Sequence, residues 1–365
     1  MAKLIRVVDA LHRLKRRITR RHGEAKGVLL VSAGGLGDTV LFSKVLPRFM
    51  QIAEADEPVT VLLRHDGAKT AFLFADPVAT EIVDFHRFDR QPAYRWAILD
   101  RLYRANFRRV ISTDYLRHPY IDEAMIAATA ADDTAAMEAR PWAKYDKALR
   151  RNRSLFETLV ESEPPRTDKI MRWARFADRL LGTDGEPPVL AEQRAAEPTQ
   201  TIFIQPFSAV AAKHSPPQLY AAIINALPSG FEVVITGTAR DMECNPNFAP
   251  LLDLPNVGFD ASTFADLMPR LRTAALVISV DTALMHLAVV AGAPTLCLAS
   301  AAYVGEIVPY DPLISPDNVH FEYVSMPCEG CLGDCIHPLE GGMYRCVAGL
   351  DTATVINRVL KLLAG

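Results

Sequence analysis

The chain has 365 residues, of which 50% are apolar, and its 40 lysines and arginines nearly balance its 43 acidic residues for a net charge of −3. This composition excludes a disordered tail protein, a disulfide-stabilised miniprotein, a collagen and a coiled coil, and the length fits about two domains. The most apolar stretch, 284–304, contains His286 and Pro294, so we expect buried core there rather than a membrane span. We expect no nucleic-acid partner.

The N-terminal segment 1–26 is strongly basic, with nine lysines and arginines against two acidic residues. Val7 and Val8 run straight into Asp9 with no apolar region behind them, so we expect no secretory signal and a cytoplasmic location. Apolar residues at three- to four-residue steps predict one apolar stripe on a helix with a basic opposite face: Leu4, Val7 or Val8, Leu11, Leu14 and Ile18. Two interpretations stay open: a helix docked on its own domain, or a helix on an anionic membrane surface, peripheral on the inner face of the inner membrane.

Segment 27–182 alternates short β-branched runs with helical stretches, which predicts a parallel sheet with helices on both faces. The expected strands are 28–31, 59–63, 81–84 and 110–112, and the helices between them include 41–53 and 94–106. Residues 114–182 are rich in alanine and are predicted to be mainly helical, with amphipathic stretches at 153–160 and 169–181.

Segment 183–200 is rich in proline and lacks apolar periodicity, so we predict an interdomain linker there. Segment 201–350 repeats the alternation, and segment 351–365 adds a closing helix. The expected strands are 201–205, 232–236, 276–280 and 295–298, and the expected helices are 217–227, 264–273 and 352–363. The predicted fold class is α/β, with two Rossmann-like doubly wound domains facing a central cleft and ligands at the carboxyl ends of the strands.

A glycine-rich turn follows the first expected strand and contains Gly35, Gly37, Asp38 and Thr39. Its spacing is not that of a dinucleotide-binding turn, and no Gly-Lys-Ser/Thr follows, so a P-loop is excluded as well. Asp38 stands at a helix start. It either caps that helix or serves as a general base aimed into the cleft, and the segment alone leaves both open.

Two further strand ends carry polar residues that suit a phosphate. After strand 276–280 come Asp281, Thr282, Ala283 and His286, at a helix start whose free N–H groups could bind a diphosphate. The alternative is a helix cap with a buried histidine. After strand 201–205 come Ser208 and Lys213, which could hold a phosphate by hydrogen bond and charge; the alternative is a merely solvated lysine.

A cysteine cluster lies near the end of the chain, with the spacing C-x2-C-x3-C-x10-C: Cys328, Cys331, Cys335 and Cys346. Four thiols so close together could enclose a tetrahedral zinc or iron ion, which would be structural because no coordination position stays open. The alternative is a reduced loop that binds no metal.

Together these segments resemble the family 9 glycosyltransferases, which include the ADP-heptose:lipopolysaccharide heptosyltransferases, over most of residues 27–363. The most specific part is the run from Asp281 and Thr282 to His286-Leu287-Ala288, where D-T-G-x-x-H-L-A is typical of the family. The glycine–aspartate turn at Asp38, and Ser208 with Lys213, also match the family pattern. Two departures are Ala283 in place of glycine and Ser215 in place of tryptophan; they leave the donor's identity open.

The resemblance implies the GT-B fold, a nucleotide-diphospho-sugar donor such as ADP-heptose, inversion at the anomeric carbon and no cofactor required for catalysis. Asp38 would be the catalytic base, and the substrate-binding residues would be Gly35, Gly37, Thr39, Ser208, Lys213, Asp281, Thr282, Ala283 and His286. The acceptor would be a lipopolysaccharide core or another surface glycan. The alternatives are a protein O-heptosyltransferase acting on an exported autotransporter, a branch that uses such cysteines for iron, and a degenerate nucleotide-sugar binder without catalysis.

Overall fold

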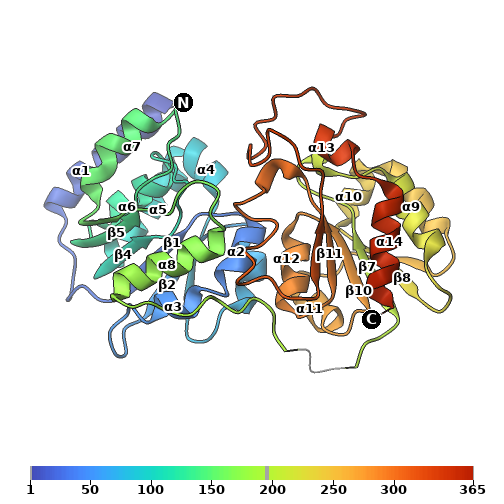
Figure 1. The fold of residues 1–365 in the computed structure, drawn as a ribbon. Helices are drawn as coiled ribbons and strands as arrows, with labels where there is room; N and C mark the ends of the chain where they lie inside the picture. The colour runs from blue at the N-terminus through green and yellow to red at the C-terminus, as the bar shows by residue number, and fades with distance from the viewer. Residues whose placement is uncertain (1, 194–196, 365) are drawn as a thin grey trace. The chain divides into compact units, whose positions relative to one another are not determined.

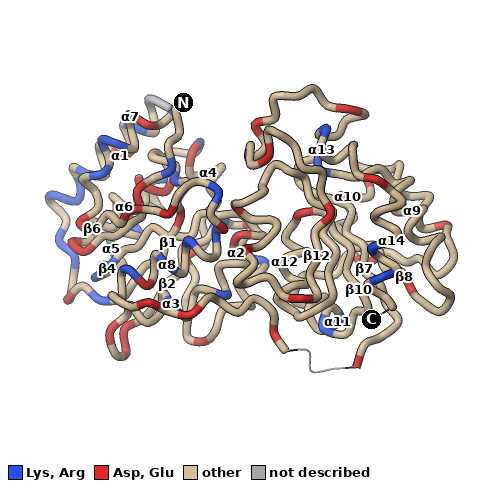
Figure 2. Tube along the Cα trace, viewed as in Figure 1, with Lys and Arg blue, Asp and Glu red and all other residues tan. Residues whose placement is uncertain are grey.

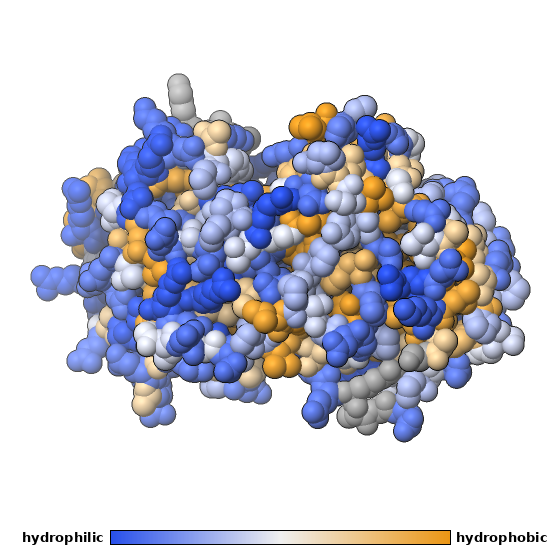
Figure 3. Space-filling view, viewed as in Figure 1, coloured by the Kyte–Doolittle hydropathy of each residue, from blue (hydrophilic) through white to orange (hydrophobic). Residues whose placement is uncertain are grey.

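The computed structural model describes residues 2–193 and 197–364, which form two compact units (Figure 1). Unit 1 comprises Met1–Pro165 and Ile170–Glu186, and unit 2 comprises Arg166–Lys169 and Pro187–Gly365. Residues 1, 194–196 and 365, which include part of the expected linker and the ends of the expected terminal segments, lie outside the described residues. The surface on the face in view is mainly hydrophilic (Figure 3), in keeping with apolar residues gathered in buried cores.

The sheet of unit 1 has six parallel strands among the described residues, in the order β3-β2-β1-β4-β5-β6. The strands are β1 (Val28–Ser32), β2 (Val59–Arg64), β3 (Ala79–Val83), β4 (Arg109–Ser112), β5 (Asp133–Met137) and β6 (Thr158–Val160). Every residue of the central strand β1 is buried, as expected when helices cover both faces of a parallel sheet.

The helices of unit 1 correct several expectations. They are α1 (Ala2–Ile18), α2 (Leu36–Phe42), α3 (Leu46–Met50), α4 (Phe85–Arg90), α5 (Pro92–Arg104), α6 (Asp122–Thr129), α7 (Asp146–Asn152) and α8 (Lys169–Leu181), with 3-10 turns η1 (Gly67–Leu73) and η2 (Arg153–Leu155). The single helix expected at 41–53 is two short ones. The mainly helical region expected at 114–182 contains β5 and β6, and 153–160 is a 3-10 turn and a strand. Alanine-rich β5 is buried between β4 and β6, so its tertiary setting overrides local propensity.

The basic helix α1 docks on its own unit, but not through the apolar stripe expected from the sequence. Its buried face consists of Ile5, Val8 and His12, and the other apolar residues of the expected stripe are exposed. Asp9 on this helix accepts two hydrogen bonds, of 2.6 and 2.8 Å, from the fully buried guanidinium of Arg95 in α5. One face of α1 is therefore fixed to α5 while another stays uncovered.

Unit 2 repeats the same strand order, β12-β11-β10-β7-β8-β9, again with six parallel strands among the described residues. The strands are β7 (Thr201–Gln205), β8 (Glu232–Thr236), β9 (Val257–Asp260), β10 (Leu276–Val280), β11 (Thr295–Leu298) and β12 (Val319–Glu322). The helices are α9 (Pro217–Ala226), α10 (Ala239–Cys244), α11 (Phe264–Leu271), α12 (Ala283–Val290), α13 (Arg345–Ala348) and α14 (Thr352–Leu363), with 3-10 turns η3 (Ala211–Lys213), η4 (Pro246–Asp253) and η5 (Ala301–Tyr303).

This strand order has one point in each sheet where the direction of winding reverses, between β1 and β4 in unit 1 and between β7 and β10 in unit 2. In doubly wound sheets, ligands bind outside the carboxyl ends of the two strands at that point. The glycine-rich turn follows β1, and the other two polar motifs follow β7 and β10. The fold therefore places each motif where its own sheet is expected to bind a ligand.

Candidate functional site

In unit 1 the turn after β1 is tied to the segment after β4. The backbone N–H of Ala33 donates to a carboxylate oxygen of Asp114 at 2.7 Å. The backbone N–H and the hydroxyl of Thr113 both donate to the carbonyl of Val31, at 3.1 and 3.0 Å. These bonds fix the backbone at the switch point and hold the glycine-rich turn in one conformation.

Asp38 lies in the first turn of α2, and its carboxylate accepts a 2.7 Å hydrogen bond from the backbone N–H of Gly35. The capping role considered from the sequence is therefore present in the structure. A Cβ atom at Gly34 would lie 2.4 Å from the Cβ of Asp38, so this position requires glycine for the close approach. Asp38 is half-buried, which leaves part of it accessible to a ligand of unit 1.

The other residues of this turn have packing roles in the structure. Thr39 is 1% exposed, and its hydroxyl donates to the carbonyl of Gly35 at 3.0 Å. A Cβ atom at Gly67 would meet the Thr39 hydroxyl at 2.4 Å, so η1 packs tightly against this side chain. Gly37 lies in the same helical turn and is half-buried.

Three charged residues at the carboxyl edge of this sheet were not predicted from the sequence: Arg64, Asp114 and Asp122. The pKa of Arg64 is raised, first by its hydrogen bond to Asp66 and further by the charges of Asp38 and Asp122. The carboxylates of Asp38 and Asp122 thus act on the guanidinium of Arg64. Arg64 ends β2 and Asp114 follows β4, so a search of all strand ends for charged residues would have found these two.

Asp122 is 5% exposed, and burial raises the pKa of its carboxyl from 3.8 to about 7. One carboxylate oxygen accepts a 2.7 Å bond from the backbone N–H of His118, which opposes this shift, while the charges of Asp114 and Glu123 add to it. The neutral form is therefore favoured in the folded chain over a range in which the unfolded chain is ionised. A buried acid that titrates near neutral pH is typical of functional sites, although structural networks shift pKa values in the same way.

We expect Asp122→Asn to stabilise the protein increasingly as pH rises. The folded-state pKa lies above the unfolded one, so the wild type loses stability between about pH 4 and pH 7, whereas the amide does not titrate. At 1.4 kcal/mol per pKa unit, the gain should be about 2–4 kcal/mol at pH 8 and less than half of that at pH 5. Urea unfolding at both pH values measures it; the exposed Asp184→Asn should shift stability by no more than about 0.5 kcal/mol. An equal effect of Asp122→Asn at both pH values would contradict the raised pKa.

In unit 2 a buried ion pair joins the turns after β7 and β10. The ammonium of Lys213 lies 2.7 Å from a carboxylate oxygen of Asp281 and 2.8 Å from the Asp281 carbonyl. Lys213 is 8% exposed and Asp281 is 6% exposed, so the interpretation of Lys213 as a solvated lysine is wrong. The ammonium also lies 4.7 Å from the centre of the Tyr303 ring.

The remaining polar residues of unit 2 lie around this pair. Thr282 is the N-terminal cap residue of α12, its hydroxyl is 3.2 Å from that of Ser279, and Ala283 is the first residue of the helix. Ser208 is half-buried, and its backbone N–H donates to the ring of His214 at 2.8 Å. The N–H groups at the start of α12 receive no hydrogen bond from the side chain of the cap residue, and such groups at a helix N-terminus suit a phosphate.

His286 has the buried setting that was one of its two interpretations. It is 4% exposed, and its Nδ1 lies 2.6 Å from the hydroxyl of Tyr310. Ser215, where the family has tryptophan, is 1% exposed. Through this contact His286 links α12, the helix to which it belongs, to Tyr310 in the interior of unit 2.

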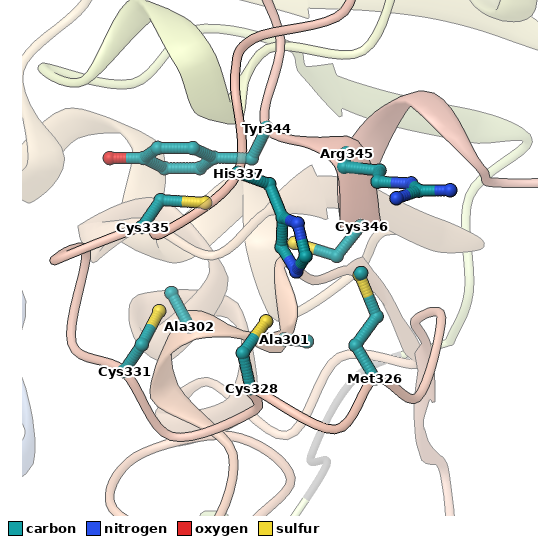
Figure 4. Close-up of a pocket in the computed structure, with 10 residues that line it drawn as sticks. All are labelled: Ala301, Ala302, Met326, Cys328, Cys331, Cys335, His337, Tyr344, Arg345 and Cys346. Carbon is teal, nitrogen blue, oxygen red and sulfur yellow. The ribbon is translucent and has the colours of Figure 1, made fainter.

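The four clustered cysteines line one small cavity in unit 2 (Figure 4). Its volume is about 10 Å³, about the space of a single water molecule or ion, and the ring of His337 also lines it, among the cysteine side chains. Burial raises the pKa of the Cys346 thiol, and the nearby Cys335 and Cys331 act in the same direction. Among the described residues, however, no three His, Cys, Asp or Glu side chains meet in a metal-binding arrangement.

The model of glycosyltransferase family 9 (heptosyltransferase) matches residues 134–325, which is more than half of the chain. The chain belongs to glycosyltransferase family 9. This confirms the family, and with it the glycosyltransferase activity, predicted from the sequence. No curated protein matches the chain in sequence.

Solved structures of this family share the fold. A family 9 glycosyltransferase from Veillonella parvula matches with a TM-score of 0.64 at 15% identity, covering 93% of this chain and 98% of its own. The Escherichia coli heptosyltransferase WaaC, solved with ADP, gives a TM-score of 0.61 at 16% identity, with 92% and 97% covered. The iron-containing dodecameric glycosyltransferase TibC from enterotoxigenic E. coli gives 0.50 at 14% identity, with 94% and 78% covered. These matches confirm the predicted α/β fold of the GT-B class, and such enzymes typically need no cofactor for catalysis.

Proposed function

We propose that this family 9 enzyme transfers a heptose from ADP-heptose to a surface-glycan acceptor, with inversion at the anomeric carbon. The observation that carries the proposal is the buried Lys213–Asp281 pair at the switch point of unit 2, beside the N-terminus of α12. This arrangement suits a diphosphate. WaaC, a relative of similar fold, was solved with ADP, which supports the same nucleotide here.

The donor diphosphate would bind to unit 2 through charge and backbone N–H groups. An ammonium has three N–H donors, and Asp281 takes two of those of Lys213, so one can reach a phosphate oxygen. The N–H groups at the start of α12, next to Thr282 and Ala283, and the hydroxyl of Ser208 would supply the others. As the bond to the sugar breaks, the negative charge on the leaving diphosphate is stabilised by these same donors.

Asp38 of unit 1 would remove the proton from the acceptor hydroxyl. A general base must be ionised, and the first turn of a helix favours the carboxylate form. The hydrogen bond from Gly35 fixes one oxygen of this carboxylate. The half-buried carboxylate would accept the acceptor's proton while the hydroxyl oxygen attacks the anomeric carbon opposite the leaving diphosphate.

The acceptor separates two versions of this function. A lipopolysaccharide core or similar glycan is the first. The second is a protein O-heptosyltransferase. The cysteine-lined cavity supports it, because the resemblance links such cysteines to an iron-using branch that modifies autotransporters, and TibC, an enzyme of similar fold, is iron-containing. Purified enzyme with ADP-heptose should be offered a truncated core glycolipid, and in a separate experiment the enzyme should be co-expressed with an autotransporter; mass spectrometry reads the products of both. Modification of neither, while ADP-heptose is left intact, would refute the proposal.

We also propose a structural zinc or iron ion at the cysteine cluster, whichever acceptor the enzyme uses. Four thiols around a cavity of one-ion size fit such an ion in donor type, and its role would be to close the loop 328–346. Their present arrangement does not bring three ligands together, so binding would draw the sulfurs inward.

We expect purified protein to carry about one zinc or iron ion per chain, the number that one tetrahedral thiolate site allows. Cys331→Ser should lower metal content and melting temperature together, because metal-binding energy is folding energy for this loop. Cys244→Ser, at an exposed cysteine away from the cavity, should change neither. Elemental analysis measures the metal content, and thermal melts measure the melting temperature. A metal-free protein with four reactive thiols would contradict the metal site and indicate a reduced loop.

We also propose that the enzyme works in the cytoplasm, attached at the inner face of the membrane. Among the helices that the structure describes, none has both the length and the apolar character needed to cross a bilayer. Lysines and arginines gather along α1 (Figure 2), which supports attachment to an anionic surface.

A further inference from the structure

The outer face of α1 carries an apolar stripe made of Leu4, Val7, Leu11, Leu14 and Ile18. Each of these side chains is between 50% and 83% exposed. They are five of the thirteen large apolar side chains that are exposed in the described part of the chain, so this short helix holds an unusual share of them. A continuous exposed apolar row of this kind marks an interaction surface.

The orientation of this stripe is fixed by polar contacts of α1 with its unit. Asp9 binds the buried Arg95, and the ammonium of Lys15 lies 2.5 Å from a carboxylate oxygen of Asp100. Arg16 donates a 3.0 Å hydrogen bond to the carbonyl of Ala128 at the end of α6. Rotating α1 to bury the stripe would break all of these contacts, so the stripe stays outward.

Basic side chains flank the stripe along one side of α1. Arg6, Arg13 and Arg17 are seven and four residues apart, which places them in one row on a helix. Arg13 and Arg17 are exposed, and neither has an ion-pair partner among residues 2–193 and 197–364. Such a row beside an apolar stripe is the pattern of a helix that lies in the surface of an anionic bilayer.

A cavity of about 370 Å³ opens beside this row, between α1, α6 and the α7–η2 segment. Four arginines line it: Arg6, Arg13, Arg16 and Arg151. The two acids of its lining are engaged by other arginines, Asp9 by Arg95 and Glu123 by Arg117.

One buried side chain of the lining has a polar atom without a hydrogen-bond partner. His12 lines it, is 1% exposed, and its Nε2 has no hydrogen-bond partner among the described residues. An excess of positive charge together with this unpartnered nitrogen suits an anionic group of modest size.

We propose that α1 is a membrane-docking helix for an anionic phospholipid bilayer. Its apolar stripe enters the interfacial layer, its arginine row binds lipid phosphates, and the cavity beside it takes one phosphate headgroup. A second copy of the chain is a poorer occupant, because a symmetric contact through this face would bring two positive rows together. This inference deepens the membrane part of the proposed function, but it can be tested without donor or acceptor.

The test is co-sedimentation of the full chain with vesicles of phosphatidylglycerol and phosphatidylethanolamine, compared with vesicles of phosphatidylcholine alone. The wild type should bind the anionic vesicles at least about tenfold more strongly, and the preference should fall as salt rises. Leu11→Glu with Leu14→Glu should weaken binding by at least about tenfold, because charged side chains cannot enter the apolar layer. Arg13→Gln with Arg17→Gln should weaken it about 25-fold, since each charge near such a surface contributes about fivefold.

Matched controls come from unit 2. Leu313→Glu replaces a leucine that is 68% exposed, and Arg240→Gln removes an exposed arginine; neither should change vesicle binding. All four variants alter exposed positions, so their melting temperatures should match that of the wild type, and the arginine variant carries the test if the glutamate variant unfolds.

The inference would be overturned if both α1 variants bound anionic vesicles as strongly as the wild type does. It would also be overturned if the wild type bound both vesicle types equally. A change of oligomeric state in the stripe variant with unchanged vesicle binding would do so too, and would indicate a contact between copies. Failure here leaves sugar transfer from ADP-heptose untouched, and failure of transfer leaves vesicle binding untouched.

Discussion

Asp38→Asn should lower the rate of sugar transfer by about 10²- to 10⁴-fold, the usual loss when a general base is removed. The amide has the size of the carboxylate, and its oxygen can still accept the hydrogen bond from Gly35, so the start of α2 should stay intact. Because Asp38 belongs to unit 1, the affinity for a nucleotide-sugar bound by unit 2 should change little. Steady-state kinetics and calorimetry on the same preparation measure the two effects separately.

A matched control is available in the same unit. Asp84 caps α4 by accepting a 2.9 Å hydrogen bond from the backbone N–H of Arg87, a role like the one seen for Asp38. Asp84→Asn should leave the transfer rate within about twofold of the wild type. If Asp38→Asn also turns over at nearly the wild-type rate, Asp38 is a cap and nothing more.

Lys213→Ala should destabilise the protein by about 3–5 kcal/mol, because it leaves the buried carboxylate of Asp281 without its partner. It should also weaken nucleotide-sugar binding. That loss should depend little on salt, since screening acts weakly on a buried pair. Urea unfolding gives the first effect and calorimetry at two salt concentrations gives the second.

The double variant Lys213→Met with Asp281→Asn tests whether the loss of stability comes from the unpaired charge of Asp281. It removes both charges, so it should be clearly more stable than Lys213→Ala while still binding the nucleotide-sugar poorly. Lys361→Ala, at an exposed lysine of α14, should change stability by no more than about 0.5 kcal/mol. A double variant as unstable as Lys213→Ala would show that the pair's charges do not account for the loss.

The sequence predicted the strands best where β-branched residues are dense. The expected strands 201–205 and 276–280 coincide with β7 and β10, and two of the three predicted motifs follow the carboxyl ends of these strands. Strand β5 was missed because its alanines carry no strand signal, and only pairing with β4 and β6 makes it a strand.

Contacts between distant residues limited the prediction of the site. Lys213 and Asp281 were each singled out, but they are 68 residues apart, and only the strand order brings them together. Asp122 lies in a helix with no motif around it, so its burial could not be foreseen. On α1 the apolar spacing was recognised, but Arg95 in α5 decides which face turns inward.

Calorimetric titration of ADP-heptose into the wild-type chain tests donor binding, the step on which the proposed transfer depends. We expect saturable binding of one ADP-heptose per chain, competition by ADP for the same site, and much weaker binding to the Lys213→Met, Asp281→Asn double variant. No saturable binding of either ADP-heptose or ADP to a folded wild-type chain would contradict it.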